Sequence, residues 1–69
     1  MSTTVGDDFP VQQARVRAIM QEYRSLPDGA GMLAALLMEQ ALQRADRAIL
    51  SGDLVEILRS YNELVGFEL

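Results

Sequence analysis

The stretch ILSGDLVEI at residues 49–57 has the spacing most suggestive of chemistry, Ser51-Gly52-Asp53 followed by Glu56. A hydroxyl, a glycine and two carboxylates could belong to a loop that binds a phosphate or a metal ion. A phosphate loop needs several glycines and a cation, and a calcium loop needs four or more oxygen ligands at alternating positions. Neither set is present. The stretch is therefore predicted to be a corner between two helices, in which Gly52 closes the first, Asp53 caps the second and Glu56 reaches back to the N–H of Asp53.

The rest of the chain offers little chemistry. Histidine, cysteine and lysine are all absent, which removes thiolate nucleophiles, the usual zinc sites, Schiff-base chemistry and the best proton-transfer group near pH 7. Glu39 and Asp46 lie seven residues apart on one side of a helix, which favours a solvated face over a carboxylate metal site. Tyr23 and Tyr61 are predicted to be core-edge residues. We expect no catalytic, cofactor-binding or metal-binding residue, and hence a protein that is not an enzyme.

Size and charge narrow the class of partner. A chain of 69 residues buries only about 60% of the surface that its unfolded form exposes, and it has no disulfide to support it. Self-association or binding to another protein is the remaining way for the chain to gain stability. The formal charge of −4 argues against a nucleic-acid partner. The longest apolar run, Met32–Met38, is too short to span a membrane, and Met1–Asp8 lacks the features of a secretion signal, so we expect a cytoplasmic protein without a small-molecule substrate.

Hydrophobic periodicity predicts an all-α fold of three helices, at about residues 9–26, 29–50 and 54–65, in a single domain of residues 9–69 behind a flexible tail of residues 1–8. Asp7 or Asp8 is expected to cap the first helix, with Pro10 in its first turn. Pro27 ends that helix and Asp28 is expected to cap the second. The tight corner at Gly52 makes helices two and three an antiparallel hairpin, which we expect to assemble into a homo-oligomeric helical bundle.

Each expected helix has an apolar face. On the second helix this face consists largely of glycine and alanine, which lets another helix approach closely. The predicted inner residues are Phe9, Val16, Ile19, Met20, Tyr23 and Leu26 in the first helix; Ala30, Gly31, Ala34, Leu37, Met38, Ala41, Ala45, Ala48 and Ile49 in the second; and Leu54, Ile57, Leu58, Tyr61, Leu64 and Val65 in the third.

The second helix carries apolar residues on its other side as well. Met32, Leu33 and Leu36 point away from the small-residue face, where a surface helix should be polar. Either the first helix or the amino-terminal tail folds over them, or they form an exposed patch, with Leu50, that meets another chain. We take the patch as the predicted partner-binding site, with Arg24 and Arg47 as charges at its rim. The corresponding function is a protein–protein interaction module that binds itself and a further protein.

The arginines of the first helix point to an alternative function. Arg17 and Arg24 lie on one side of the first helix, with Gln13 and Gln21 beside them. A dimer that set two such helices side by side would double these charges, as in a small nucleic-acid-binding regulator. The stripe has no aromatic residue for stacking, so an ordinary solvated face is the competing interpretation.

Residues 23–64 read YRSLPDGAGMLAALLMEQALQRADRAILSGDLVEILRSYNEL. They carry Leu26-Pro27 followed by two glycines, an apolar helix with Glu39, the run RADRAILSGD, and a tyrosine one turn before a leucine. This stretch resembles small, mostly uncharacterised helical accessory proteins of tailed bacteriophages and prophages. The resemblance implies an accessory protein of particle assembly or host modulation, acting in a bacterial or phage-infected cell, with no assigned active site. The pattern A..AI.SGD also occurs in tetratricopeptide-like helix pairs, but the chain has no second copy of it.

Overall fold

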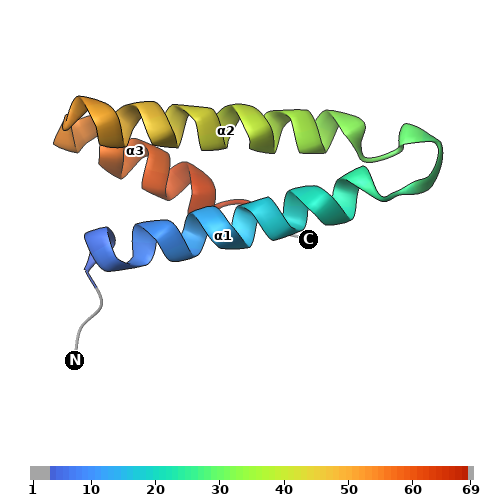
Figure 1. The fold of residues 1–69 in the computed structure, drawn as a ribbon, viewed down its shortest axis with the longest axis horizontal. Helices are drawn as coiled ribbons and strands as arrows, with labels where there is room; N and C mark the ends of the chain where they lie inside the picture. Colours follow the sequence, from blue (N-terminus) through green and yellow to red (C-terminus); the bar gives the residue numbers. More distant parts are fainter. Residues whose placement is uncertain (1–3, 69) are drawn as a thin grey trace.

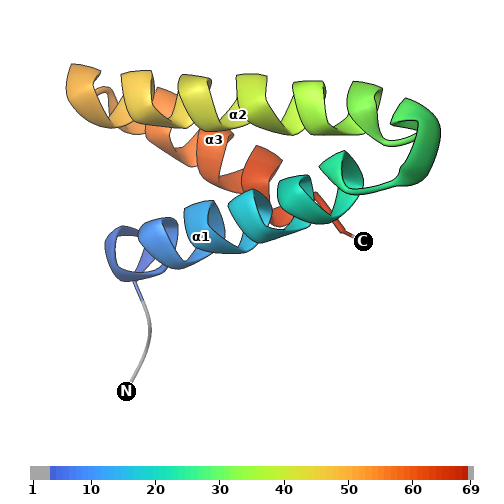
Figure 2. The same ribbon diagram turned by 45° about the vertical axis from the view of Figure 1, so that its right-hand side comes forward.

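The computed structural model describes residues 4–68, and these residues form three α-helices. They are α1 (Val5–Arg24), α2 (Met32–Ser51) and α3 (Leu54–Val65), with a short 3-10 turn at Pro27–Gly29 between the first two. α1 and α2 run antiparallel, and α3 turns back from the end of α2 so that its last turn approaches the middle of α1 (Figures 1 and 2). The predicted all-α, three-helix domain with a tight corner between helices two and three is confirmed.

α1 begins at Val5, four residues before the predicted start. Thr4 is the cap, because its Oγ1 accepts a hydrogen bond from the N–H of Asp7 at 3.1 Å. Asp7 and Asp8 lie in the first turn, where negative charge complements the helix dipole. Neither is the cap, and residues 5–8 are helical, so the tail was predicted too long; residues 1–3 of it lie outside the described residues.

The turn between α1 and α2 differs from the prediction in one respect. Leu26 is extended, with ψ 142°, as the proline after it requires. Asp28 does not cap α2, because its backbone is left-handed, with φ 59°, and belongs to the 3-10 turn. α2 starts at Met32, three residues later than predicted, after Gly31, which has no capping side chain.

The corner at residues 51–53 forms as predicted. Gly52 adopts φ 70° and its N–H closes the last turn of α2 on the carbonyls of Ala48 and Ile49. Asp53 caps α3, since its Oδ1 accepts hydrogen bonds from the N–H groups of Val55 and Glu56. The return bond from Glu56 is not formed, because the N–H of Asp53 donates to Ser51 Oγ instead. The hydroxyl of Ser51, the backbone of Gly52 and the carboxylate of Asp53 therefore serve the turn.

The core lies where the three helices meet, and the small residues of α2 let α1 and α3 approach it. Leu37 and Ile49 were predicted to be inner residues but are exposed. Ala35 and Leu42 take their place, because α1 packs on that side of α2. The buried apolar residues are Phe9, Val16, Ile19 and Met20 of α1; Ala35, Met38, Ala41, Leu42, Ala45 and Ala48 of α2; and Leu64 of α3.

α3 is rotated relative to its predicted orientation. It buries Ser60 and Leu64, and Ile57 and Tyr61 are half-buried, while the predicted inner residues Leu54, Leu58 and Val65 are exposed. α3 has only twelve residues. It contacts both other helices with one narrow side and leaves the rest of its apolar face at the surface.

Candidate functional site

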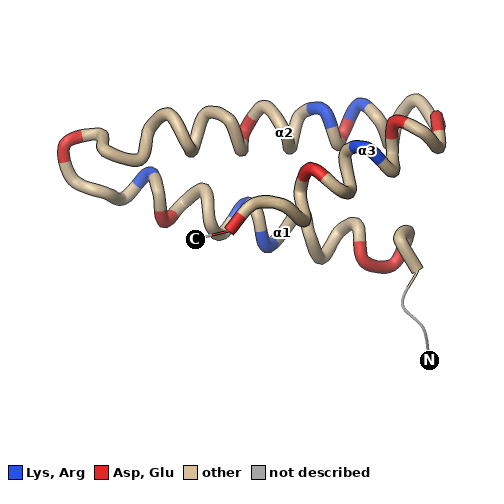
Figure 3. Tube along the Cα trace, turned by 180° about the vertical axis from the view of Figure 1, so that it is seen from behind, with Lys and Arg blue, Asp and Glu red and all other residues tan. Residues whose placement is uncertain are grey.

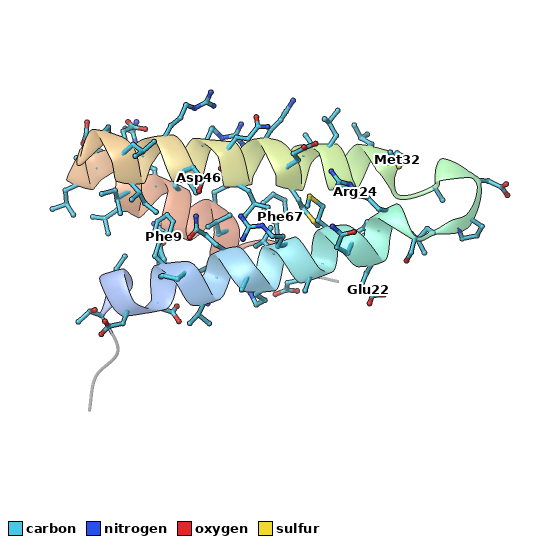
Figure 4. All side chains as sticks on the ribbon, in the orientation of Figure 1. Phe9, Glu22, Arg24, Met32, Asp46 and Phe67 are labelled. Atoms are coloured by element: carbon cyan, nitrogen blue, oxygen red, sulfur yellow. The ribbon has the colours of Figure 1, made fainter. Side chains whose placement is uncertain are left out.

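The predicted patch on α2 is exposed in the structure. Met32, Leu33, Leu36 and Leu50 keep 53%, 71%, 48% and 86% of their accessible surface. No part of residues 4–68 folds over them, so the enclosed alternative does not hold for the part of the chain that the structure describes. Figure 4 places Met32 at the first turn of α2, next to the connection from α1. Four large apolar side chains on one helix therefore face solvent.

These residues belong to a longer row, which we call the outer stripe of α2. Along it the spacing alternates between three and four residues, so the row follows one side of the helix. The core residues Met38, Ala41 and Ala45 lie on the opposite side, and every member of the stripe is exposed. The stripe consists of Leu33, Leu36, Gln40, Gln43, Arg47 and Leu50, with Met32 at its edge.

The two predicted rim charges have different surroundings. Arg24 Nη2 lies 3.2 Å from Glu39 Oε2, so this arginine ties α1 to α2 (Figure 4). Arg47 lies on the outer stripe itself, is exposed, and forms no ion pair with any residue between 4 and 68. Only Arg47 therefore keeps a charge that is free to meet a second molecule at the patch.

The arginines expected to serve a nucleic-acid regulator are also divided. Arg24 is held by Glu39, and Arg15, on the same helix, points into the structure toward α3. Arg17 is exposed but has no other unpaired arginine of α1 beside it within residues 4–68. This geometry does not favour the regulator.

An open cleft of about 430 Å³ separates α2 from α3 on the side away from α1. Arg44 is held by Glu63 through bonds of 3.1 and 2.8 Å, which raise the pKa of its guanidinium, and Arg59 pairs with Glu56 at 3.3 Å. Glu63 lies one turn beyond Arg59 on α3, but its carboxylate is bound by Arg44. Figure 3 shows the basic and acidic positions of the two helices interleaved there. The cleft is lined by Arg44, Arg47, Ala48, Ser51, Glu56, Arg59, Ser60 and Glu63.

A polar network between α1 and α3 was not predicted. Tyr61 Oη donates to Asp8 Oδ2 at 2.6 Å, and Gln12 Nε2 donates to the same oxygen at 3.1 Å. The Phe9 ring packs beside Tyr61, with ring centroids 6.2 Å apart. Nothing in the local sequence indicates this network, because Asp8 and Tyr61 are 53 residues apart along the chain. Its hydrogen bonds fix the angle at which α3 meets α1.

Arg15 extends the network to the end of α3. Its Nε donates to Gln12 Oε1 at 2.8 Å, and its Nη atoms donate to the carbonyls of Phe67 and Leu64 at 2.7 Å and of Val65 at 3.2 Å. The last carbonyls of a helix have no partner inside the helix and carry its partial negative charge. Arg15 therefore caps α3 from another helix. Its role is structural.

The Asp8–Tyr61 pair should make stability depend on pH. The hydrogen bonds from Tyr61 and Gln12, with the charge of Arg15, lower the pKa of Asp8 below its usual 3.8, and the bond to Asp8 raises the pKa of Tyr61 above 10.0. Asp8 then stabilises the fold above about pH 4, and this contribution is lost as the pH falls through its lowered pKa. Tyr61 contributes below pH 10 and its contribution is lost as the pH rises through its raised pKa.

Thermal melting between pH 2 and 7 checks this with Tyr61→Phe. We expect the melting temperature of the variant to fall below that of the wild type at pH 7 and the difference to shrink below pH 4. Tyr23→Phe is the matched control, because Tyr23 is also half-buried but its hydroxyl bonds to no described residue. A gap for Tyr61→Phe that stays constant from pH 7 to pH 2 would refute the role of Asp8.

The described residues contain no group of three or more acidic side chains that could hold a metal ion. Glu39 and Asp46 each bind α1 instead, through Arg24 and through Gln13 Nε2 at 3.0 Å. None of the helices within residues 4–68 combines the length and apolar character needed to cross a membrane. Comparison of the chain with protein-family models, with curated proteins and with solved structures finds no match in any of the three.

Proposed function

We propose that this protein is a non-enzymatic protein–protein interaction module that self-associates through the outer stripe of α2. The observation that carries the proposal is the exposure of Leu33, Leu36 and Leu50 on the side of α2 opposite the core. Isolated apolar residues at a surface are ordinary, but a row of them along one helix marks an interaction site. The resemblance of residues 23–64 to small phage proteins supports a setting in particle assembly or host modulation.

The shape of the molecule supports the same proposal. The molecule measures 40 × 27 × 15 Å, and its elongated shape keeps α2 open along its outer side. A second copy would cover that side.

The expected strength of association is modest. Burying the exposed part of one leucine contributes about 1 kcal/mol, since a fully buried leucine contributes about 1.5–3 kcal/mol. Three leucines and Met32 from each copy make eight apolar side chains. Together they contribute about as much as the roughly 4–15 kcal/mol of translational and rotational freedom that association costs. We therefore expect self-association that depends on protein concentration.

Leu33→Glu tests the proposal. Leu33 is 71% exposed, so the substitution should leave the helices intact while placing a charge in the contact. Sedimentation equilibrium should give a mass that rises with concentration for the wild type and stays at 7.6 kDa for Leu33→Glu. Val55→Glu is the matched control, because Val55 is 57% exposed on α3, away from the stripe, and should behave like the wild type. Equal masses for the wild type and Leu33→Glu, with unchanged helical circular dichroism, would contradict the proposal.

A further inference from the structure

We infer that two copies of the chain pair through α2 in antiparallel orientation, about a two-fold axis between Gln40 and Gln43. This inference rests on the proposed function and adds the geometry of the contact. The spacing of the outer stripe, three and four residues in alternation, is that of a coiled-coil seam. A seam on the side opposite the core leaves α1 and α3 behind α2, so neither helix blocks a second α2.

The stripe is self-complementary when it is reversed. With the axis midway between Gln40 and Gln43, Leu33 of one copy meets Leu50 of the other. Gln40 of one copy then meets Gln43 of the other. Leu33 and Leu50 are the most exposed large apolar residues of α2. Leu36 then lies against Arg47 of the second copy, whose aliphatic stem can cover it while the guanidinium reaches solvent. The most exposed leucines thus cover each other at both ends of the contact.

A parallel pairing is disfavoured by charge. It would set every residue of the stripe against itself, so Arg47 would face Arg47 of the other copy. The stripe contains no acidic residue that could neutralise that pair, and like charges opposed in a contact cost several kcal/mol. The antiparallel pairing sets each arginine against Leu36 of the other copy and places the two arginines about 16 Å apart along the helix axis, because 11 residues of helix rise about 1.5 Å each. Arg47 has no ion pair within residues 4–68, so its side chain is available for this contact.

The symmetry identifies the occupant as a second copy. A two-fold contact requires one surface to match itself, with residue i meeting j and j meeting i. The outer stripe meets this condition at all three of its residue pairs. An unrelated partner would have no reason to require leucines at both ends and glutamines at the centre.

Cysteine cross-linking tests the register, and the absence of native cysteine makes the experiment clean. Leu33→Cys and Leu50→Cys are made as separate variants and oxidised mildly, each alone and as an equal mixture. In the antiparallel pair the two thiols of Leu33→Cys lie about 25 Å apart, because 17 residues of helix rise about 1.5 Å each, and a disulfide cannot form over that distance. Only the mixture should give a covalent dimer, formed from one chain of each variant. A mixture of Leu33→Cys with Val55→Cys is the matched control and should give none.

The outcomes separate the register from the proposed function. A covalent dimer from Leu33→Cys alone would establish a parallel contact, which overturns the register and leaves self-association through α2 intact. No covalent dimer in any mixture, while the reduced variants sediment as dimers, would overturn the register and also the use of this stripe. If the reduced variants and the wild type all sediment as monomers, the proposed function fails together with the inference.

Discussion

Replacing Arg15 with methionine should lower the free energy of unfolding by about 2–3 kcal/mol, since a hydrogen bond from a charged group contributes about 1.5–3 kcal/mol. The guanidinium donates to the carbonyls of Leu64, Val65 and Phe67, and methionine keeps the apolar stem while it removes every donor. A domain of this size rarely exceeds about 3–5 kcal/mol of stability. The loss should therefore leave much of the population unfolded at 37 °C.

Urea unfolding followed by circular dichroism measures the effect, with Arg17→Met as the matched control. Arg17 lies half a turn away on α1, is exposed, and has no ion pair among the described residues. Its substitution should change the free energy of unfolding by no more than about 0.5 kcal/mol. If Arg15→Met and Arg17→Met were equally stable, Arg15 would not be the cap that holds α3 against α1.

Gly31→Ala should destabilise the fold by about 3 kcal/mol. The added methyl group would overlap the carbonyl oxygen of Tyr23 and come within 2.8 Å of the carbonyl carbon of the same residue. These are backbone atoms of α1, which cannot move aside as a side chain could. Overpacking typically costs about 1–3 kcal/mol. Because this contact lies next to the connection between α1 and α2, the two helices would have to move apart to accommodate the methyl group.

Gly6→Ala is the control for Gly31→Ala and should have the opposite sign. Gly6 lies in α1, and an added methyl group would meet only Thr4 Oγ1, at 3.8 Å. Alanine is favoured over glycine inside a helix by about 0.5–1 kcal/mol, so this variant should be more stable than the wild type. A Gly31→Ala variant as stable as the wild type in urea unfolding would show that the two helices do not approach closely at Tyr23.

Local signals in the sequence predicted the local structure well. The corner at Gly52 and Asp53 was predicted because the helix-ending glycine and the capping aspartate both act on residues within one turn of themselves. The same rule failed at the start of α1, where Asp7 or Asp8 was predicted as the cap and Thr4 occupies it instead. Which candidate is used depends on how far the helix extends, and residues 5–8 are held by the contact of Asp8 with Tyr61.

Contacts between distant segments could not be predicted. The periodicity of α3 shows that it has an apolar face. It does not show how α3 is rotated about its own axis when it packs against two helices at once. The hydrogen bonds from Arg15 and Tyr61 fix that rotation, and they leave Leu54, Leu58 and Val65 exposed. The patch at Met32, Leu33 and Leu36 could be predicted because it depends only on an excess of apolar residues around one helix.

We propose that a second copy of the chain covers the outer stripe of α2 in solution. Sedimentation equilibrium of the unsubstituted protein over a range of concentrations tests this claim most directly. The mass should rise from 7.6 kDa toward twice that value as the concentration increases. A mass that stays at 7.6 kDa up to the millimolar range would contradict it.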